Sequence, residues 1–536
     1  MLLLLHLLSL VPGVFFEEIV TSQAALARLA SMERELVELA KEHAGKMEAA
    51  VAAIEEYVDQ VSEVYKVACK GGECSERQLQ EKVLGNPIYN YQLLKRVTVY
   101  WANVEKAIDK VDREAMLSKV RKIKRRSANL PSEADLQQAA RTLTRLADVY
   151  SLNPEDLAAG SLMGLATGAV LSTKDTYYLA RTAAMQEKPE LAAGLAEAAI
   201  AMAARVQNST SVGGGGGGGV QVGAMQQMLQ QQRQKVKQAK GVEENKEEFR
   251  LGVIPPRTSD GRQLTTDQDR INFNALCRGE SLLRKETEAL LFCQYSDRGD
   301  PFFRLHPVPV EVLHPKPHEV LLFHNVISSS ESVKLGDIAA NKLKQSAIGQ
   351  AKELSEIRVS RNAWLEDGVA PMVDKINLRT DRLTKLQSSA TWAKFGEGMK
   401  RKEEFEFLQV AEYGIGGHYN VHQDPMFVYK DSTFIAESVE SKVPYLTGDR
   451  MSTLMYYLSD VPAGGVTAFP RLGVATKPEL GAAIFWHNIK RSGASDMAML
   501  HGGCPVVLGA KMVANKWMRE VAQMQHRPCG LSPEDQ

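Results

Sequence analysis

The chain has 536 residues, of which 44% are hydrophobic, and its formal net charge is zero. A chain of this length is expected to form several domains, and its apolar content is ordinary for a globular protein. Because acidic and basic residues balance, the composition gives no indication of nucleic-acid binding.

The first residues of the chain are apolar. Residues 1–11 are rich in leucine and precede Pro12 and Gly13. This run has the length of a signal-peptide core and is too short to span a bilayer, although it lacks the usual preceding basic residues. We therefore predict a signal peptide over residues 1–14, with a buried N-terminal helix as the alternative. No later run has the length and hydrophobicity of a membrane span, so we expect a soluble secretory protein.

Residues 15–128 have the apolar spacing of helices. An early apolar stripe is followed by a seam in which apolar residues recur at alternating steps of four and three, as in a heptad repeat. Such a seam is buried either within one chain, as a helical hairpin, or between two chains. The stripe comprises Leu26, Leu29, Met32, Leu36 and Leu39, and the seam comprises Met47, Val51, Ile54, Val58, Val61 and Tyr65.

Residues 129–207 form a second helical block, with small residues at the expected helix contacts. This pattern is typical of helix-turn-helix units such as tetratricopeptide repeats. Residues 208–268 then contain seven consecutive glycines, a glutamine-rich helical patch and a charged stretch. Because a glycine run favours a flexible chain, we predict a linker here. Asn208 opens an Asn-Ser-Thr triplet, an acceptor for N-glycosylation.

Residues 269–529 are predicted to form the last domain, in which the pattern changes to strands from about Glu319. Short apolar runs are separated by glycine and proline, which is typical of strands joined by tight turns. Many short strands in one domain favour a jelly-roll sandwich, here a double-stranded β-helix. The predicted fold class is therefore multidomain α + β, with helices first and a jelly-roll last.

Three residues in this last region have the chemistry of an iron site. His422 and Asp424 are alternate residues, so in a strand both side chains point to one face. His501, much later in the chain, can complete the set from a neighbouring strand. Two imidazoles and one carboxylate on one face of Fe(II) leave positions open for substrates, as in non-haem iron oxygenases.

Lys511 follows His501 inside an otherwise apolar run, residues 505–513. A cation in a strand that reads as buried requires an anionic partner. The distal carboxylate of 2-oxoglutarate is such an anion.

The amino-acid sequence around these residues resembles that of a known protein family. Four segments resemble the catalytic domain of collagen prolyl 4-hydroxylase α subunits, and the resemblance runs from about Phe273 to Cys529. A further segment, residues 85–96, resembles the part of that family's N-terminal domain where helices pair two α subunits. The four catalytic segments are residues 404–419, 456–461, 464–470 and 515–517.

This resemblance implies an activity and a set of cofactors. Proline would be hydroxylated at C4 while 2-oxoglutarate and O₂ are consumed and succinate and CO₂ are released. Fe(II) would be held by His422, Asp424 and His501, and L-ascorbate would keep the iron reduced. Lys511 would pair with the distal carboxylate of 2-oxoglutarate, and Tyr419 would donate a hydrogen bond to the same carboxylate.

The resemblance also implies a peptide site and a disulfide pattern. The block at 129–207 would bind proline-rich peptide, with Tyr177 and Tyr178 as groove residues, although the glycine run indicates that the block is shortened. The six cysteines allow 15 pairings. Cys69 and Cys74 are close enough in sequence to close a small loop. The family pairing would join Cys277 to Cys293 and Cys504 to Cys529.

Partners and location follow from the same resemblance. Two α chains would join through residues 15–128, and each would bind one protein disulfide isomerase β subunit. Residues 531–536 carry no retrieval signal, so the isomerase would retain the complex in the lumen of the endoplasmic reticulum. Three alternatives remain: a hydroxylase acting on a non-collagen proline-rich protein, a catalytically silent helical scaffold, and a lysyl hydroxylase, which is disfavoured because related enzymes use Arg where Lys511 stands.

Overall fold

The structure is a computed structural model, and its chain divides into two compact units, residues 1–142 with 168–170 and residues 143–167 with 171–536. The predicted signal peptide, Cys69, Cys74 and the glycine run lie outside the described residues. The described residues are 22–44, 54–62, 84–108, 119–120, 122–123, 131–210, 222–243, 266–346, 358–389, 405–425, 427–430, 433–436 and 448–532.

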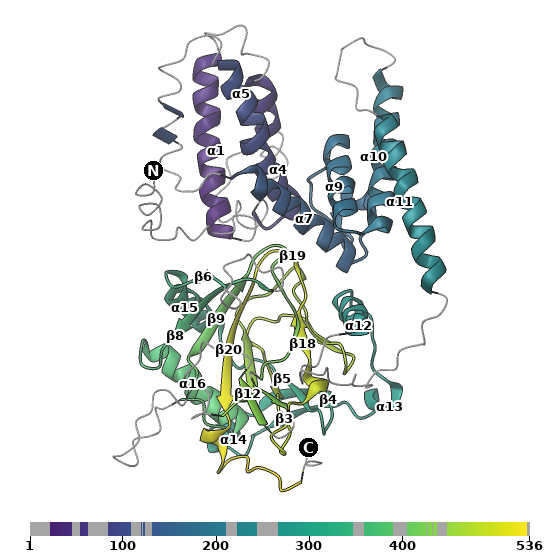
Figure 1. Ribbon diagram of the computed structural model, residues 1–536. Coiled ribbons are helices and arrows are strands. Elements are labelled where there is room, and N and C mark those ends of the chain that lie inside the picture. Colours follow the sequence, from purple (N-terminus) through teal and green to yellow (C-terminus); the bar gives the residue numbers. More distant parts are fainter. Residues whose placement is uncertain are drawn as a thin grey trace, which may run out of the picture. The chain divides into compact units, whose positions relative to one another are not determined.

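The first unit is helical, as predicted (Figure 1). Its main elements are α1 (Gln23–Ala44), a helical segment at residues 54–62, α4 (Pro87–Lys95), the π-helical turn η2 (Arg96–Tyr100) and α5 (Trp101–Ile108). Asn86 begins α4 by accepting a hydrogen bond from the Ile88 amide, and proline at the next position suits the first helical turn.

The early apolar stripe on α1 is buried inside this single chain. All five of its residues are at most 6% exposed. The same helix is tied to η2 by a buried ion pair between Glu33 and Arg96, whose closest N–O distance is 2.6 Å. Ile54 and Val61 of the heptad seam are also buried, whereas Met47, Val51 and Tyr65 lie outside the described residues. The stripe therefore packs intramolecularly, and self-association through the seam stays a prediction.

The second helical block continues further than predicted. Its elements are α7 (Glu133–Val149), α8 (Pro154–Ala158), the hairpin β1 (Ser161–Leu162) and β2 (Leu165–Ala166), α9 (Thr173–Met185), α10 (Pro189–Thr210) and α11 (Val222–Glu243). Ser172 and Asp175 form a capping box that begins α9. Among the described residues, no helix is long and apolar enough to cross a membrane.

The predicted flexible linker is wrong over α11, because this helix packs against α10. Met225 and Gln232 of α11 are buried, and Arg233 forms an ion pair with Glu197 of α10 at 2.7 Å. The alanine-rich sequence of α10 allows the close approach. Asn208 lies in the last turn of α10, and its side chain is outside the described residues.

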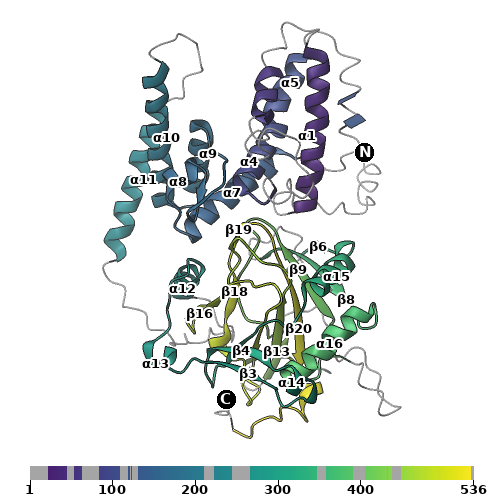
Figure 2. The same ribbon diagram turned by 180° about the vertical axis from the view of Figure 1, so that it is seen from behind.

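The C-terminal region contains two larger sheets built from antiparallel pairs (Figures 1 and 2). The nine-stranded sheet has the order β3-β4-β5-β17-β13-β20-β9-β8-β6, and the five-stranded sheet has the order β16-β15-β18-β10-β7. The nine-stranded sheet comprises β3 (Cys293–Ser296), β4 (Val308–His314), β5 (Val320–Phe323), β6 (Lys344–Gln345), β8 (Arg361–Leu365), β9 (Leu408–Tyr413), β13 (Arg450–Tyr457), β17 (Ala483–His487) and β20 (Lys511–Arg519). The five-stranded sheet comprises β7 (Arg358–Val359), β10 (His418–His422), β15 (Thr467–Phe469), β16 (Val474–Thr476) and β18 (His501–Gly503).

The described part of this region also contains two further strand pairs, five α-helices and two short 3-10 helices, η5 (Met497–Met499) and η6 (Val521–Gln523). The pairs are β11 (Phe427–Lys430) with β12 (Thr433–Ala436) and β14 (Ala463–Gly464) with β19 (Val506–Leu508). The helices are α12 (Asp267–Cys277), α13 (Lys285–Glu288), α14 (Pro301–Leu305), α15 (Ser329–Ala340) and α16 (Pro371–Thr384).

The central strand β13 of the nine-stranded sheet is buried on both faces. Along β13, Leu454 and Tyr456 belong to the core packed under α15 and α16. The alternate residues Met455 and Tyr457 belong to a second core that includes residues of the five-stranded sheet. Because neighbouring residues of a strand point to opposite faces, an apolar residue is required at nearly every position of such a strand.

Helix α12 crosses the outside of the five-stranded sheet. Asp269 forms a buried bidentate ion pair with Arg471, and both N–O distances are 2.9 Å. The ring of Phe273 lies so close to Gly502 of β18 that a Cβ there would be 2.7 Å from it. Glycine next to His501 therefore lets the helix pack directly on the strand.

The disulfide pairing predicted from the family resemblance is wrong in this structure. Cys277, at the end of α12, is bonded to Cys504, which follows β18, and both cysteines are buried. Cys293 and Cys529 are free and exposed. The packing of α12 explains the difference, because it brings Cys277 next to β18 of the five-stranded sheet. Cys293 instead lies on β3, an edge strand of the nine-stranded sheet.

Candidate metal centre

His422, Asp424 and His501 meet at one end of the cavity between the two sheets. His422 is the last residue of β10 and is directly paired with His501, the first residue of β18. Asp424 lies just after the end of β10. Its Oδ1 is 3.9 Å from Nε2 of His422, and its Oδ2 is 3.7 Å from Nε2 of His501. The three candidate ligand atoms lie within 4.8 Å of one another, so one ion can contact all three.

Both imidazoles are held with Nε2 facing the centre. Nδ1 of His422 is 2.8 Å from the carbonyl oxygen of Asn420, and Nδ1 of His501 is 2.9 Å from that of Met499. A ring nitrogen that donates its proton to a carbonyl leaves the other nitrogen unprotonated, which is the form that binds a metal.

The electrostatics of the three residues favour metal binding. Burial, followed by the neighbouring His501, lowers the pKa of His422 to about 3, so its ring is neutral at physiological pH. Burial opposes ionisation of Asp424, but His501, His422 and Arg450 together hold its pKa below the ordinary value. The set thus offers two imidazole nitrogens and one carboxylate, the chemistry of an iron-binding facial triad.

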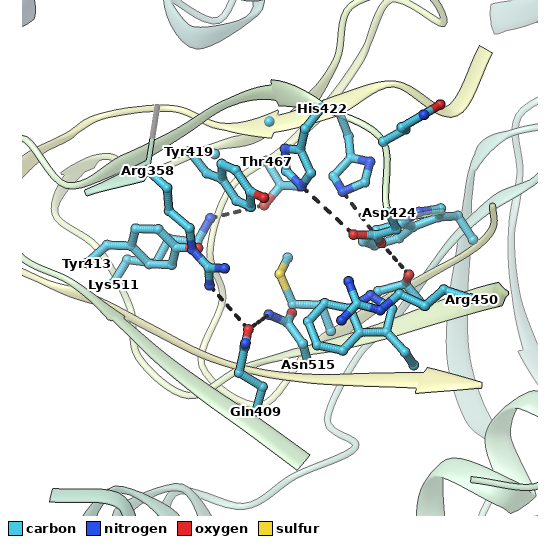
Figure 3. Close-up of a pocket in the computed structure, with 18 of the residues that line it drawn as sticks. Arg358, Gln409, Tyr413, Tyr419, His422, Asp424, Arg450, Thr467, Lys511 and Asn515 are labelled. Carbon is cyan, nitrogen blue, oxygen red and sulfur yellow. Dashed lines mark hydrogen bonds and ion pairs between the residues drawn. The ribbon is translucent and has the colours of Figure 1, made fainter. Parts of the chain in front are cut away.

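Lys511 lies at the other end of the cavity (Figure 3). It begins β20, is 3% exposed, and donates a hydrogen bond of 3.1 Å to the Thr467 hydroxyl. Its Nζ also lies over the rings of Tyr413 and Tyr457, 5.9 Å and 5.6 Å from their centroids. Burial lowers the pKa of Lys511 to about 7, and among the described residues no acid pairs with it. An anionic ligand would supply the missing charge.

The cavity between these two ends has a volume of about 170 Å³, enough for a small dicarboxylate and too little for a folded polypeptide segment. Its wall includes Trp486 and Trp517, both buried, with Arg450 lying 3.8 Å above the Trp517 ring. The cavity therefore has the candidate metal ligands at one end and a buried cation at the other, and its wall is partly aromatic.

Tyr419 lies beside the metal centre. Its ring stacks on His422 with a centroid separation of 3.5 Å, and Arg358 lies 4.7 Å from the Tyr419 centroid. The structure therefore places Tyr419 against the imidazole, whereas Tyr413 and Thr467 surround the ammonium of Lys511.

Several contributors were not identified from the sequence. Tyr413 and Thr467 flank Lys511 through long-range strand contacts: Tyr413 is the register partner of Lys511, and Thr467 reaches it from the other sheet. Thr453, on β13, donates a hydrogen bond to Oδ2 of Asp424. No short motif links these residues, so only the fold could reveal them.

Comparison with known proteins agrees with this chemistry. The family model described as "Prolyl 4-Hydroxylase alpha-subunit, N-terminal region" matches residues 22–164, and that of the "2OG-Fe(II) oxygenase superfamily" matches residues 408–519. The latter range contains the metal-ligand set and Lys511. The chain is thus a 2-oxoglutarate-dependent enzyme of the Fe(II) oxygenase class, and its three ligands fit that metal.

Similar proteins cover most of the chain. Prolyl 4-hydroxylase subunit alpha-2 of Caenorhabditis elegans is 32% identical over 84% of this chain and 83% of its own length. Prolyl 4-hydroxylase subunit alpha-1 of Homo sapiens is 28% identical over 97% of this chain and 96% of its own length. A solved structure of the collagen prolyl hydroxylase of Paramecium Bursaria Chlorella virus-1, in complex with 2OG, is 26% identical, with a TM-score of 0.27 over 37% of this chain and 95% of its own. On its identity to the nematode subunit, the chain belongs to the prolyl 4-hydroxylase α-subunit family.

Proposed function

We propose that this chain hydroxylates proline at C4 in collagen-like or other proline-rich polypeptides of the secretory pathway. The observation that carries the proposal is the shared cavity, in which His422, Asp424 and His501 face the buried Lys511. Among the described residues, no acid pairs with this lysine. A silent scaffold has no need of a buried cation or of three convergent ligands. We also propose that the two sheets form a double-stranded β-helix.

The proposed roles follow from the two ends of the cavity. His422, Asp424 and His501 would hold Fe(II), which with bound 2-oxoglutarate and O₂ supplies the oxidising chemistry, and L-ascorbate would keep the iron reduced. Lys511 and the Thr467 hydroxyl would hold the distal carboxylate and so orient the keto acid toward the metal. Tyr413, the register partner of Lys511, stands where its hydroxyl can add a hydrogen bond. Tyr419 is the second proposed donor.

The surroundings of the cavity would exclude water during turnover. Trp486 lies 4.7 Å from the His501 ring, and Phe469 lies 5.5 Å from it. An apolar wall beside the ligands limits solvent access and protects a reactive centre from side reactions.

The helical regions would bind peptide and partner chains. We propose that the block from α7 to α11 binds proline-rich peptide, with Tyr177 and Tyr178, both half-buried, as groove residues. We further propose an assembly of two α chains with two protein disulfide isomerase chains in the lumen of the endoplasmic reticulum, consistent with relatives named as subunits.

The experiment measures 4-hydroxyproline by mass spectrometry after incubation of the complex with Fe(II), 2-oxoglutarate and ascorbate. Collagen-like (Pro-Pro-Gly) repeats and plain polyproline are compared as substrates, and succinate is quantified in parallel. We expect equal amounts of succinate and 4-hydroxyproline with at least one peptide. Succinate release without any hydroxyproline from either peptide would overturn the assignment of the substrate.

A further inference from the structure

Asp424 has two carboxylate oxygens that could bind a metal, and the two oxygens differ in their hydrogen bonding. Oδ1 faces Nε2 of His422 and Oδ2 faces Nε2 of His501, at similar distances. Geometry alone would allow the carboxylate to bind an ion through one oxygen or through both. A carboxylate that used both would take one of the positions that a facial triad leaves open for substrates.

The hydroxyl of Thr453 distinguishes the two oxygens. Thr453 lies in the middle of β13, is 1% exposed, and donates its hydrogen bond to Oδ2 of Asp424. Among the residues that the structure describes, no hydroxyl donates to Oδ1. Because a donated hydrogen bond occupies a lone pair and withdraws charge, Oδ2 becomes the weaker metal ligand.

Asn488 fixes the direction of this hydrogen bond. It lies one residue beyond β17, is 2% exposed, and its side-chain amide donates to the Thr453 hydroxyl at 2.8 Å. A hydroxyl has one proton to donate, and its oxygen here already accepts from an amide, so that proton is directed to Asp424. Asn488 is itself held by its backbone, since its N–H donates to Met451 and its carbonyl accepts from Asp496.

We propose that Thr453 and Asn488 are positioning residues that keep Asp424 a one-oxygen ligand through Oδ1, so that three metal positions remain for 2-oxoglutarate and O₂. Both residues would act on the metal through Asp424, because Thr453 donates to the carboxylate and Asn488 donates to Thr453. The inference rests on the assignment of His422, Asp424 and His501 as ligands, and it adds the reason why this carboxylate leaves the site open.

The test uses the full chain, purified with its partner, and Co(II) alone as the probe. Thr453→Val keeps the shape of the side chain but removes the hydroxyl, and Asn488→Asp supplies an acceptor that draws the Thr453 proton away from Asp424. We expect each variant to bind Co(II) about 10–100-fold more weakly, the usual range for such partners, because Asp424 loses the hydrogen bond that holds its carboxylate in a fixed orientation. We also expect a changed visible absorption spectrum of bound Co(II), because the coordination number changes.

Two further variants serve as controls. Thr453→Ser keeps the hydroxyl, so this variant should bind Co(II) with the affinity and the visible spectrum of the unmodified chain. Thr380→Val is the matched control, because Thr380 is also fully buried and hydrogen-bonded, to Ile376 and Tyr456, but lies on α16 away from the metal. We expect Thr380→Val to lower thermal stability without altering Co(II) affinity.

The outcomes separate this inference from the ligand assignment. If the unmodified chain bound no Co(II), the ligands and the inference would both be overturned. If it bound Co(II) normally and Thr453→Val and Asn488→Asp did so with unchanged spectra, only the inference would be overturned. Should Thr453→Val fail to fold, the comparison of Asn488→Asp with Thr453→Ser decides the question alone.

Discussion

At the scale of single residues, the three proposed metal ligands would carry the chemistry. Replacing His422, Asp424 or His501 with alanine removes one of three protein donors, so we expect turnover to fall by at least about 100-fold, beyond the usual effect of an indirect partner. Circular dichroism should show an intact fold. His526→Ala is the matched control, because His526 is exposed and should have no effect. Full activity in any one ligand variant would show that this residue is not a ligand.

The second prediction concerns Lys511 and the co-substrate 2-oxoglutarate. Lys511→Ala leaves a carboxylate without a partner in a buried site, so the KM for 2-oxoglutarate should rise far more than the KM for peptide. Steady-state kinetics with each substrate varied in turn measures the difference. An unchanged KM for 2-oxoglutarate would place the carboxylate anchor elsewhere.

The low pKa of Lys511 predicts a pH dependence. Without ligand, the ammonium loses its proton above about pH 7, whereas a bound carboxylate favours the protonated form. Binding above that pH therefore requires proton uptake, and the dissociation constant for 2-oxoglutarate should rise by up to about tenfold per pH unit between pH 7 and 9. Calorimetry in buffers of different ionisation heat measures the uptake. Lys511→Arg, which stays charged, should bind 2-oxoglutarate with little pH dependence over this range; an equal dependence in both proteins would contradict the account.

The residue scale also shows what sequence could and could not reveal. His422, Asp424, His501 and Lys511 were identified because metal ligands and a cation in an apolar run are conspicuous by their chemistry. Tyr413 was not, since a tyrosine at the end of an apolar strand is unremarkable until strand pairing sets it opposite Lys511. Comparing Tyr413→Phe with Tyr419→Phe for 2-oxoglutarate affinity would show which hydroxyl contributes.

At the scale of elements, α12 has a structural role that the disulfide makes testable. The Cys277–Cys504 bond closes a long loop, with a sequence separation of 227 residues, and fastens α12 next to β18. Cys504→Ser should therefore lower the free energy of unfolding by about 2–4 kcal/mol. Cys293→Ser and Cys529→Ser, at exposed positions, should change it by no more than about 0.5 kcal/mol.

Denaturant unfolding measures these differences, and mapping of unreduced peptides identifies the bonded pairs. Recovery of Cys277–Cys293 and Cys504–Cys529 peptides, with equal destabilisation by all three serine variants, would instead support the pairing of the family resemblance. Pairing could not be settled from sequence, because it depends on which strand a helix packs against.

Periodicity explains which elements were predictable. The apolar stripe of α1 and the strand pattern from about Glu319 were predicted correctly, because each reflects a local repeat that burial imposes. The packing of α11 was missed, because its glutamine-rich sequence follows a glycine run and resembles a linker. The residues that α10 buries are mostly alanines, which give little signal of a packed helix pair.

At the scale of the whole molecule, we predict dependence on a partner. Co-expression with protein disulfide isomerase should yield a complex of four chains, two of each kind, whereas expression alone should yield aggregated protein. Light scattering coupled to size-exclusion chromatography measures the mass of the complex. Isolation of an active α chain free of any isomerase would refute this dependence.

The central claim, that one cavity holds Fe(II) and 2-oxoglutarate together, is tested most directly by anaerobic titration of the purified complex. We predict a weak visible charge-transfer band that appears only when both are present, saturates at one of each per α chain, and is absent from Asp424→Ala. Lack of the band in the unmodified complex at saturating Fe(II) and 2-oxoglutarate would contradict the account.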